Sequence, residues 1–308
     1  LNDRICIYSL LQEIKPDFIF FHGLISTTIF DVLKYKRKIN PACKIVQDSH
    51  LDYFNYPYTG ESLRDKIIRG FYRCINKKSL PHIEKVYGVT PWRKEFAEKF
   101  FNIPSQKTDV LIMGADDENI NLTDKEQIKN KIRAEYNIDN NAFLIVSGGK
   151  IDKNKNFIQL MNACGKLGNT HLLLFGNVDE GISDEFDSLL KKYENITHIG
   201  WLDANKVYDY FIASDLVVFP GTHSVLWEQA CACKTPCVFK RWDGTEHVDN
   251  GGNSVFLDDV TEATLYERIK TLVFTDEYNA MKKVAESSAT DVYLYSKIAE
   301  KSLECFHK

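Results

Sequence analysis

The sequence predicts an α/β protein built from parallel sheets whose two faces are covered by helices. Short apolar runs alternate with amphipathic segments of helical period over almost the whole chain, which is the pattern of such sheets. The longest apolar runs, at 18–21 and 172–175, have the length of buried strands. With 308 residues, the chain is long enough for two domains, each with its own hydrophobic core.

Composition excludes several classes of function. The chain has 39 basic and 43 acidic residues and a net charge of −4, so it lacks the basic surface that holds nucleic acid, and no nucleic acid partner is expected. No apolar run approaches the roughly 18–20 residues of a membrane helix. The eight cysteines follow no framework of spacings, which is typical of reduced thiols. We therefore expect a cytoplasmic protein, associated at most peripherally with the inner face of a membrane.

The first third of the chain is expected to hold four strands, at 17–21, 44–47, 85–89 and 109–112. Helices are expected between them and at 3–14. The clearest helix start is Thr90-Pro91, because threonine can cap exposed amides and proline fits the first helical turn.

The polar stretch 113–119 is expected to connect the two domains. The first would comprise 1–112 together with 290–308, and the second 113–289. Strands of the second domain are expected at 142–147, 171–175, 197–199, 216–219 and 236–240. The last stretch, 290–307, is expected to form a terminal helix that returns to the first domain.

Open parallel sheets bind ligands beyond the carboxyl ends of their strands, so the loops there are the first candidates for chemistry. One such loop is S-G-G-K-I-D-K-N-K-N-F, residues 147–157. Gly149 lets a ligand approach the backbone, and Lys150 and Lys155 can bring two ammonium groups to one anion at the helix entrance. A diphosphate is the expected ligand. From spacing alone, a solvated basic turn is the alternative.

A second candidate loop lies within 219–238, again between a strand and a helix. Its backbone amides are expected at the helix N-terminus, where they can hold phosphate oxygens; they belong to the turn that contains Gly221, Thr222, His223 and Ser224. Further along, Glu228 can accept two vicinal hydroxyls of a ribose. An exposed helical glutamate is the alternative for this residue.

Two features bear on metal binding. Cys231, Cys233 and Cys237 lie close together, but no fourth ligand follows at finger-like spacing, which favours packing over a metal site. No two aspartates are separated by one residue, so the Asp-x-Asp metal motif is absent. We expect no metal.

These loops resemble those of GT-B glycosyltransferases of family four. Lys150 and Lys155 match the two basic positions that this family places against the diphosphate of its sugar nucleotide. L-L-L-F-G-N, with Gly176 and Asn177, resembles the strand and turn near the nucleotide base. The block 200–220, which begins with Gly200 and Trp201, resembles the block that ends before the donor-sugar loop. The resemblance runs in family order from about residue 85 to residue 256.

The resemblance implies two Rossmann-like domains facing a cleft, with the acceptor on the N-terminal side and the nucleotide sugar on the C-terminal side. It implies transfer of a hexose, with retention, from a UDP- or GDP-sugar to a hydroxyl acceptor on a surface polysaccharide or lipid-linked glycan. The donor is a substrate, and no cofactor is expected. Two lysines and a helix N-terminus can neutralise a leaving diphosphate, which is work that a divalent cation would otherwise do.

The resemblance also implies roles on the N-terminal side. The family carries a functional histidine after a strand in this region, and His50 matches it best, with Asp48 beside it. Both are counted as catalytic candidates. His22, at the end of the preceding strand, is the second choice and a candidate for acceptor binding. Tyr53 is either a further acceptor contact or part of the packing.

The sequence departs from the family pattern at two places. Pro220 stands where the family has the first glutamate of its Glu-x7-Glu motif, and Glu228 matches the second, ribose-binding glutamate. Either the loop 221–224 replaces the lost sugar contact, or the sugar specificity is unusual, or transfer has been lost. The family's opening strand and Gly-rich loop are also missing, so we expect a fragment of a longer enzyme.

These departures leave a second function open. The alternative to a transferase is a non-catalytic module that binds a sugar nucleotide or a glycan. A sugar-nucleotide epimerase ranks last, because no pair of acid/base carboxylates can be identified.

Overall fold

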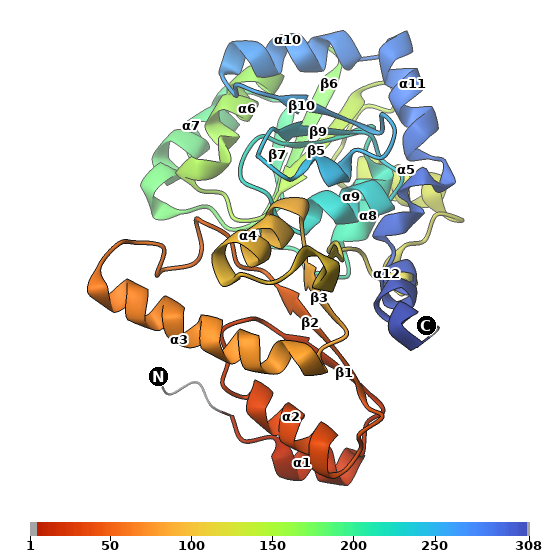
Figure 1. Cartoon of the computed structure of the whole chain (residues 1–308). Helices are drawn as coiled ribbons and strands as arrows, with labels where there is room; N and C mark the ends of the chain where they lie inside the picture. Colours follow the sequence, from red (N-terminus) through yellow and green to blue (C-terminus); the bar gives the residue numbers. More distant parts are fainter. Residues whose placement is uncertain (1–4, 307–308) are drawn as a thin grey trace. The chain divides into compact units, whose positions relative to one another are not determined.

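The computed structural model describes residues 5–306 and confirms the α/β class (Figure 1). These residues form two compact units. The first contains residues up to Met113 together with those from Ile298 onward, and the second runs from Gly114 to Lys297. Within the described part of the chain, no helix combines the length and the apolar character that crossing a bilayer requires.

The described part of the first unit contains a parallel sheet of four strands in chain order, β1-β2-β3-β4. The strands are β1 (Phe18–His22), β2 (Lys44–Ser49), β3 (Lys85–Gly88) and β4 (Thr108–Val110). The helices are α1 (Tyr8–Ile14), α2 (Ile29–Lys38), α3 (Leu63–Ser79) and α4 (Pro91–Phe101). Thr90 caps α4 as predicted, because its side chain accepts a hydrogen bond from the Arg93 amide at 3.2 Å.

The described part of the second unit contains a parallel sheet of six strands in the order β10-β9-β8-β5-β6-β7. The strands are β5 (Phe143–Gly148), β6 (Thr170–Phe175), β7 (Ile196–His198), β8 (Leu216–Phe219), β9 (Cys237–Lys240) and β10 (Ser254–Leu257). The helices are α5 (Lys125–Glu135), α6 (Phe157–Gly165), α7 (Ser183–Lys192), α8 (Val207–Ala213), α9 (Leu226–Ala232), α10 (Glu262–Leu272) and α11 (Asp276–Ala285). Sequence patterning missed β10.

The strand order of the second unit is that of a Rossmann fold and fixes where a ligand can bind. β5 pairs with β6 on one side and with β8 on the other, so the chain leaves β5 in one direction and later returns to its opposite edge. Loops that follow two such neighbouring strands diverge and leave room beyond their carboxyl ends. The loops after β5 and β8 therefore lie at the switch point of this sheet.

The end of the chain differs from the prediction of one helix over 290–307. It forms a 3-10 helix, η7 (Ser288–Tyr293), then α12 (Tyr295–Ser302), then a second 3-10 helix, η8 (Glu304–Phe306). Residues 3, 4 and 307, which the predicted terminal helices included, lie outside the described residues.

The predicted domain boundary at residue 290 is also wrong, because 290–297 belong to the second unit. Tyr293 is fully buried, and its hydroxyl donates to the His247 carbonyl at 2.7 Å. The backbone carbonyl of Tyr293 accepts from the Ala115 amide at 2.8 Å. These contacts hold the segment against the second unit until α12 has begun.

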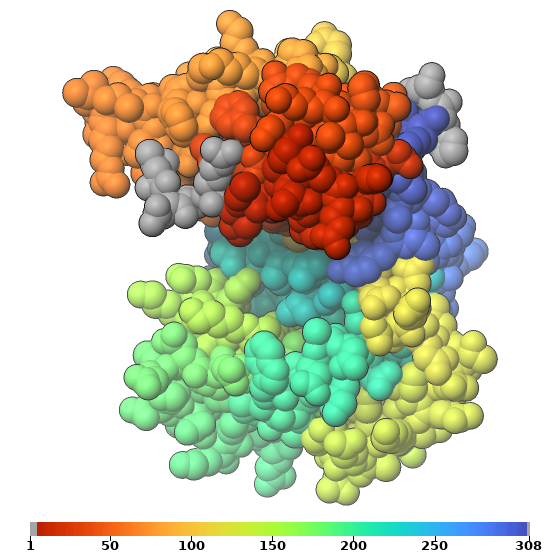
Figure 2. Space-filling view, turned by 90° about the horizontal axis from the view of Figure 1, so that it is seen from below, coloured from red at the N-terminus to blue at the C-terminus, as the bar shows by residue number. Residues whose placement is uncertain are grey.

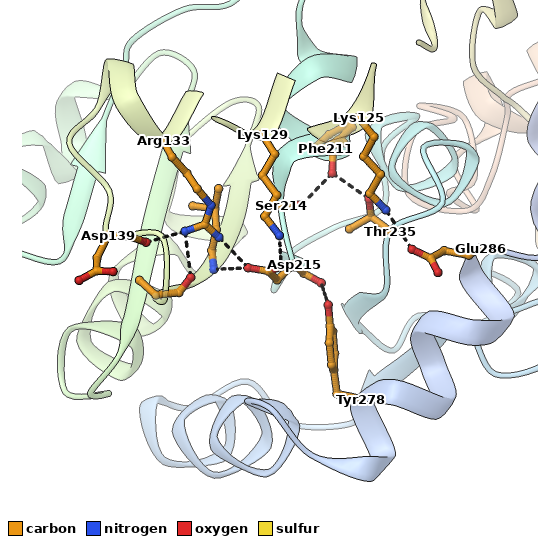
Figure 3. Close-up of polar contacts among 12 residues, drawn as sticks. Lys125, Lys129, Arg133, Asp139, Phe211, Ser214, Asp215, Thr235, Tyr278 and Glu286 are labelled. Atoms are coloured by element: carbon orange, nitrogen blue, oxygen red, sulfur yellow. Dashed lines mark hydrogen bonds and ion pairs between the residues drawn. The ribbon is translucent and has the colours of Figure 1, made fainter. Parts of the chain in front are cut away.

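A buried ion pair stabilises the second sheet at the amino ends of β5 and β8 (Figure 3). Arg133 of α5 is 2% exposed and donates to the carboxylate of Asp215 at 3.0 Å. The same carboxylate accepts from the Leu144 amide at 2.8 Å and from Lys129 at 3.0 Å, and the Asp215 carbonyl accepts from Tyr278 at 3.0 Å. One aspartate thus joins α5, β5, β8 and α11.

Replacing this aspartate should destabilise the second unit. Asp215→Asn leaves the buried Arg133 guanidinium without its counter-charge, and we expect a loss of about 3 kcal/mol or more in the free energy of unfolding, measured by urea denaturation. Asp203→Asn is the matched control, because this exposed aspartate makes only a 3.8 Å pair with Lys206. Equal stability of the two variants would contradict the assignment.

Candidate functional site

The loop after β5 is built as a tight turn that leads into α6. It contains the 3-10 helix η4 (Lys153–Lys155), and the side chain of Asp152 accepts from the Asn154 amide at 2.9 Å. Asn156 follows in a left-handed conformation, with φ of 56°, and its side-chain amide donates to the Pro220 carbonyl at 2.7 Å. This bond ties the loop after β5 to the loop after β8.

Lys155 makes the second link between these loops. Its ammonium group donates to the Thr222 carbonyl at 2.5 Å. Burial lowers the pKa of Lys155, and the nearby carboxylate of Asp152 partly offsets that effect. The close approach depends on Gly221, because a Cβ at this position would lie 2.5 Å from the Lys155 Cα. Sequence reasoning did not predict this contact between Lys155 and the loop at 221–224.

Lys150 does not share a partner with Lys155. Its side chain is 70% exposed, and its ammonium group lies 3.4 Å from the Asp152 carboxylate. The two lysines of the motif are therefore arranged differently: Lys155 is held inside the loop, whereas Lys150 stands at its surface. Asp152, which sequence reasoning did not single out, pairs with Lys150 and also acts on Lys155 through its charge.

The predicted glycine turns lie next to one another. Gly149 donates its amide to the Phe175 carbonyl at 3.0 Å, and Gly176 donates to the Gly200 carbonyl at 2.7 Å. Gly176 has φ of +120°, and a Cβ on it would lie 1.8 Å from the Gly149 carbonyl oxygen. The carbonyl of Asn177 accepts from the Ile151 amide at 3.0 Å.

Trp201 follows the last of these glycines and is 67% exposed. A large apolar ring left open to solvent can serve as a stacking surface. The structure thus groups the turns after β5, β6 and β7 at one edge of the sheet and presents an aromatic face beside them.

The prediction for Glu228 as a ribose ligand is wrong for the arrangement seen here. Its side chain is 0% exposed, and Oε1 accepts from His223 Nε2 at 2.9 Å and from His247 Nε2 at 2.8 Å. Burial acts to raise the pKa of Glu228, but the two imidazoles outweigh it, so the pKa lies below its usual value. In this structure the carboxylate is closed off from solvent and links the two loops that carry His223 and His247.

His247 is the site residue that sequence reasoning missed. It lies in η6 (Glu246–Val248), nineteen residues after Glu228, and no local pattern marks it.

The predicted position of Thr222, His223 and Ser224 at a helix N-terminus is wrong. Helix α9 begins only at Leu226, with Val225 as its N-cap, so these three residues form the turn that precedes the helix.

The first unit brings together three predicted residues. Asp48 lies near the end of β2, and its carboxylate is 3.0 Å from His22 Nδ1 and 3.3 Å from His50 Nε2. The two imidazole rings lie 4.7 Å apart. Burial acts to raise the pKa of Asp48, but the hydrogen bond from His50, the charge of His22 and the Gly23 amide outweigh it, so the pKa is lowered.

Tyr53 is largely occupied by packing. Its ring meets Phe96 edge-on at 4.7 Å and lies 5.9 Å from Trp92, which leaves it 41% exposed. Packing thus accounts for much of this side chain. The neighbouring Tyr56 is 1% exposed and belongs wholly to the core.

Two clusters among residues 5–306 have the donor atoms of a metal site: His22 with Asp48 and His50, and His223 with Glu228 and His247. In both, the carboxylate lies at hydrogen-bond distance from two imidazoles. In the second cluster, Glu228 Oε2 and His247 Nδ1 are buried without a hydrogen-bond partner. The cysteines at 231, 233 and 237 are fully buried, as expected of packing residues.

The buried carboxylate gives a testable stability effect. Because the pKa of Glu228 is lowered on folding, its contribution is present above the unfolded-state pKa of about 4.3 and is lost as pH falls through the folded-state value. We expect Glu228→Gln to lower the free energy of unfolding by about 2–3 kcal/mol at neutral pH, with the difference shrinking towards pH 4 and below. Urea denaturation of Glu246→Gln, an exposed neighbour, is the control. A pH-independent difference would show that charge is not the cause.

The family model for glycosyl transferases group 1 matches residues 128–288, which is more than half of the chain. Among curated proteins, none matches. Solved structures share the fold at low identity. A glycosyltransferase from Rickettsia africae is 16% identical, with a TM-score of 0.75 over 97% of this chain and 78% of that one. HepE of Anabaena, solved with UDP, is 15% identical, with a TM-score of 0.73 over 98% and 80%.

A third similar structure is WaaG, a glycosyltransferase involved in lipopolysaccharide biosynthesis. It is 16% identical, with a TM-score of 0.65 over 89% of this chain and 80% of that one. These structures share two parallel-sheet α/β domains, the GT-B architecture that the sequence predicts. Together with the family match, they identify the chain as a member of the glycosyl transferases group 1, and thus as a glycosyltransferase.

Proposed function

We propose that this glycosyltransferase moves a hexose from a UDP- or GDP-sugar, with retention, to a hydroxyl group of a surface polysaccharide or lipid-linked glycan. One observation carries the proposal: the loops after β5 and β8 meet at the switch point of the second sheet through Lys155 and the Thr222 carbonyl. That is the place where a Rossmann-type sheet binds a nucleotide.

Support for a nucleotide-sugar donor comes from the same loops and from one similar protein. HepE has been solved with UDP and with UDP-glucose. In the present chain, Lys155 holds its ammonium group at the loop after β8, and the glycine turns at Gly149 and Gly176 lie after the neighbouring strands β5 and β6. A diphosphate needs such donors, and a cation held in place stabilises charge as it develops on the departing group.

The two lysines would act at different stages. Lys155 is already positioned, so it would hold one phosphate without reorganisation. Lys150 is exposed and paired only with Asp152 at 3.4 Å, so it can exchange this carboxylate for a second phosphate when the donor binds. Asp152 would keep its capping bond with the Asn154 amide, which it already makes through its other carboxylate oxygen. The nucleobase would stack on the exposed ring of Trp201.

The first unit would contribute His50. Its Nε2 lies 3.3 Å from Asp48, which fixes the ring and favours a proton on that nitrogen. Half-exposed, the imidazole can hydrogen bond to hydroxyls of the sugar or of the acceptor. Asp48 is a positioning residue in this scheme, because its carboxylate is buried and engaged by both histidines.

Removing the Lys155 charge should slow the reaction. We expect Lys155→Ala to lower turnover about 100-fold, the scale found when one charged or oxyanion donor is lost. Lys155→Met keeps the apolar stem and should lose nearly as much, which separates charge from packing. Lys153→Ala, an exposed lysine of the same 3-10 helix, should retain turnover. Near-normal turnover of Lys155→Met would refute the role.

Donor identity can be measured without knowing the acceptor. A ligand that binds only the folded state raises the melting temperature, so thermal shifts with UDP, GDP and ADP should show a clear preference for UDP or GDP. Slow hydrolysis of the matching nucleotide sugar should follow. Binding without hydrolysis would favour the non-catalytic alternative.

A further inference from the structure

Helix α3 exposes a stripe of large apolar side chains. Leu63 is 75% exposed, Ile67 63% and Phe71 43%, and their spacing of four residues places them on one face of the helix. Tyr72 and Ile75 of the same helix pack in the core of the first unit. The fold is therefore already anchored without the stripe, and Figure 2 shows this orange part of the chain open to solvent.

The charges around the stripe differ from those of the whole chain. The chain carries a net charge of −4, yet α3 contains six basic residues and one acidic residue. Arg69 and Arg73 are used by the fold, since each guanidinium packs on Phe100, at 5.4 and 5.6 Å from the ring centre. The remaining basic residues of the helix are exposed, and one of them, Lys66, pairs with the exposed Glu61 at 3.1 Å; the other three are Arg64, Lys77 and Lys78.

An apolar stripe flanked by cations matches one kind of partner. A second copy of this chain would bring two strongly basic helices together, which like-charge repulsion opposes. An anionic bilayer satisfies both features, because the apolar side chains enter the boundary between headgroups and acyl chains while the cations meet lipid phosphates. Charge complementarity therefore selects a lipid surface.

We propose that α3 docks this chain on an anionic membrane surface through Leu63, Ile67 and Phe71, with the exposed basic residues of the helix binding lipid phosphates. The helix would lie in the plane of the interface without spanning the bilayer. The proposal deepens the proposed function, since a lipid-linked acceptor is held at such a surface, but docking can be measured without any transfer reaction.

The test is flotation of the full chain with vesicles of phosphatidylcholine alone and with vesicles that also contain an equal share of phosphatidylglycerol. We expect binding to the mixed vesicles, weakened by salt, and little binding to the neutral ones. Ile67→Glu combined with Phe71→Glu should reduce binding about tenfold or more, because it removes apolar contact and adds two negative charges. Both residues are exposed, so the variant should keep the melting temperature.

Ile14→Glu is the matched control, because Ile14 is 62% exposed on α1 of the same unit. It should bind like the parent chain. Donor hydrolysis should be unchanged in both variants, so its absence in the parent would count against the proposed function and not against docking.

Three results would overturn the proposal. One is equal binding to neutral and anionic vesicles, and another is full binding by the double variant. The third is a self-associated chain in sedimentation experiments whose association the double variant abolishes, because the stripe would then be an interface between two copies.

Discussion

The close contact between the loops after β5 and β8 is the constraint on which the candidate site depends. These loops follow neighbouring strands that the chain reaches from opposite directions, so they diverge unless something joins them. Two side chains do so: Asn156 binds the Pro220 carbonyl, and Lys155 binds the Thr222 carbonyl. A cation in this position serves structure before any donor arrives, and its charge remains beside the place where phosphates are expected.

The buried carboxylate of Glu228 also joins two loops, those that carry His223 and His247. Burying a charge is costly unless partners compensate it, and here two imidazoles from different loops do so. The turn that holds His223 and the segment that holds His247 are thereby fixed to α9. The residue that the family pattern assigns to the ribose is part of the support for the loop in this structure.

Sequence patterning could predict the class, most strands and the site loops, because each depends on local periodicity or on turn chemistry. Gly176 and Lys155 are examples, since a turn after a strand marks both. It could not predict β10, which is short and only partly buried, or the return of Tyr293 to the second unit. Nor could it find His247 or the burial of Glu228, because both depend on which loops meet in space.

Pro220, which stands where the family motif has a glutamate, is held closely by its neighbours. The position is buried, its carbonyl is taken by Asn156, and Gly221 beside it is packed against Lys155. A glutamate placed here would add a charge at a buried position. The turn that follows, at Thr222 and Ser224, is only half-buried, so it is the more open part of this loop.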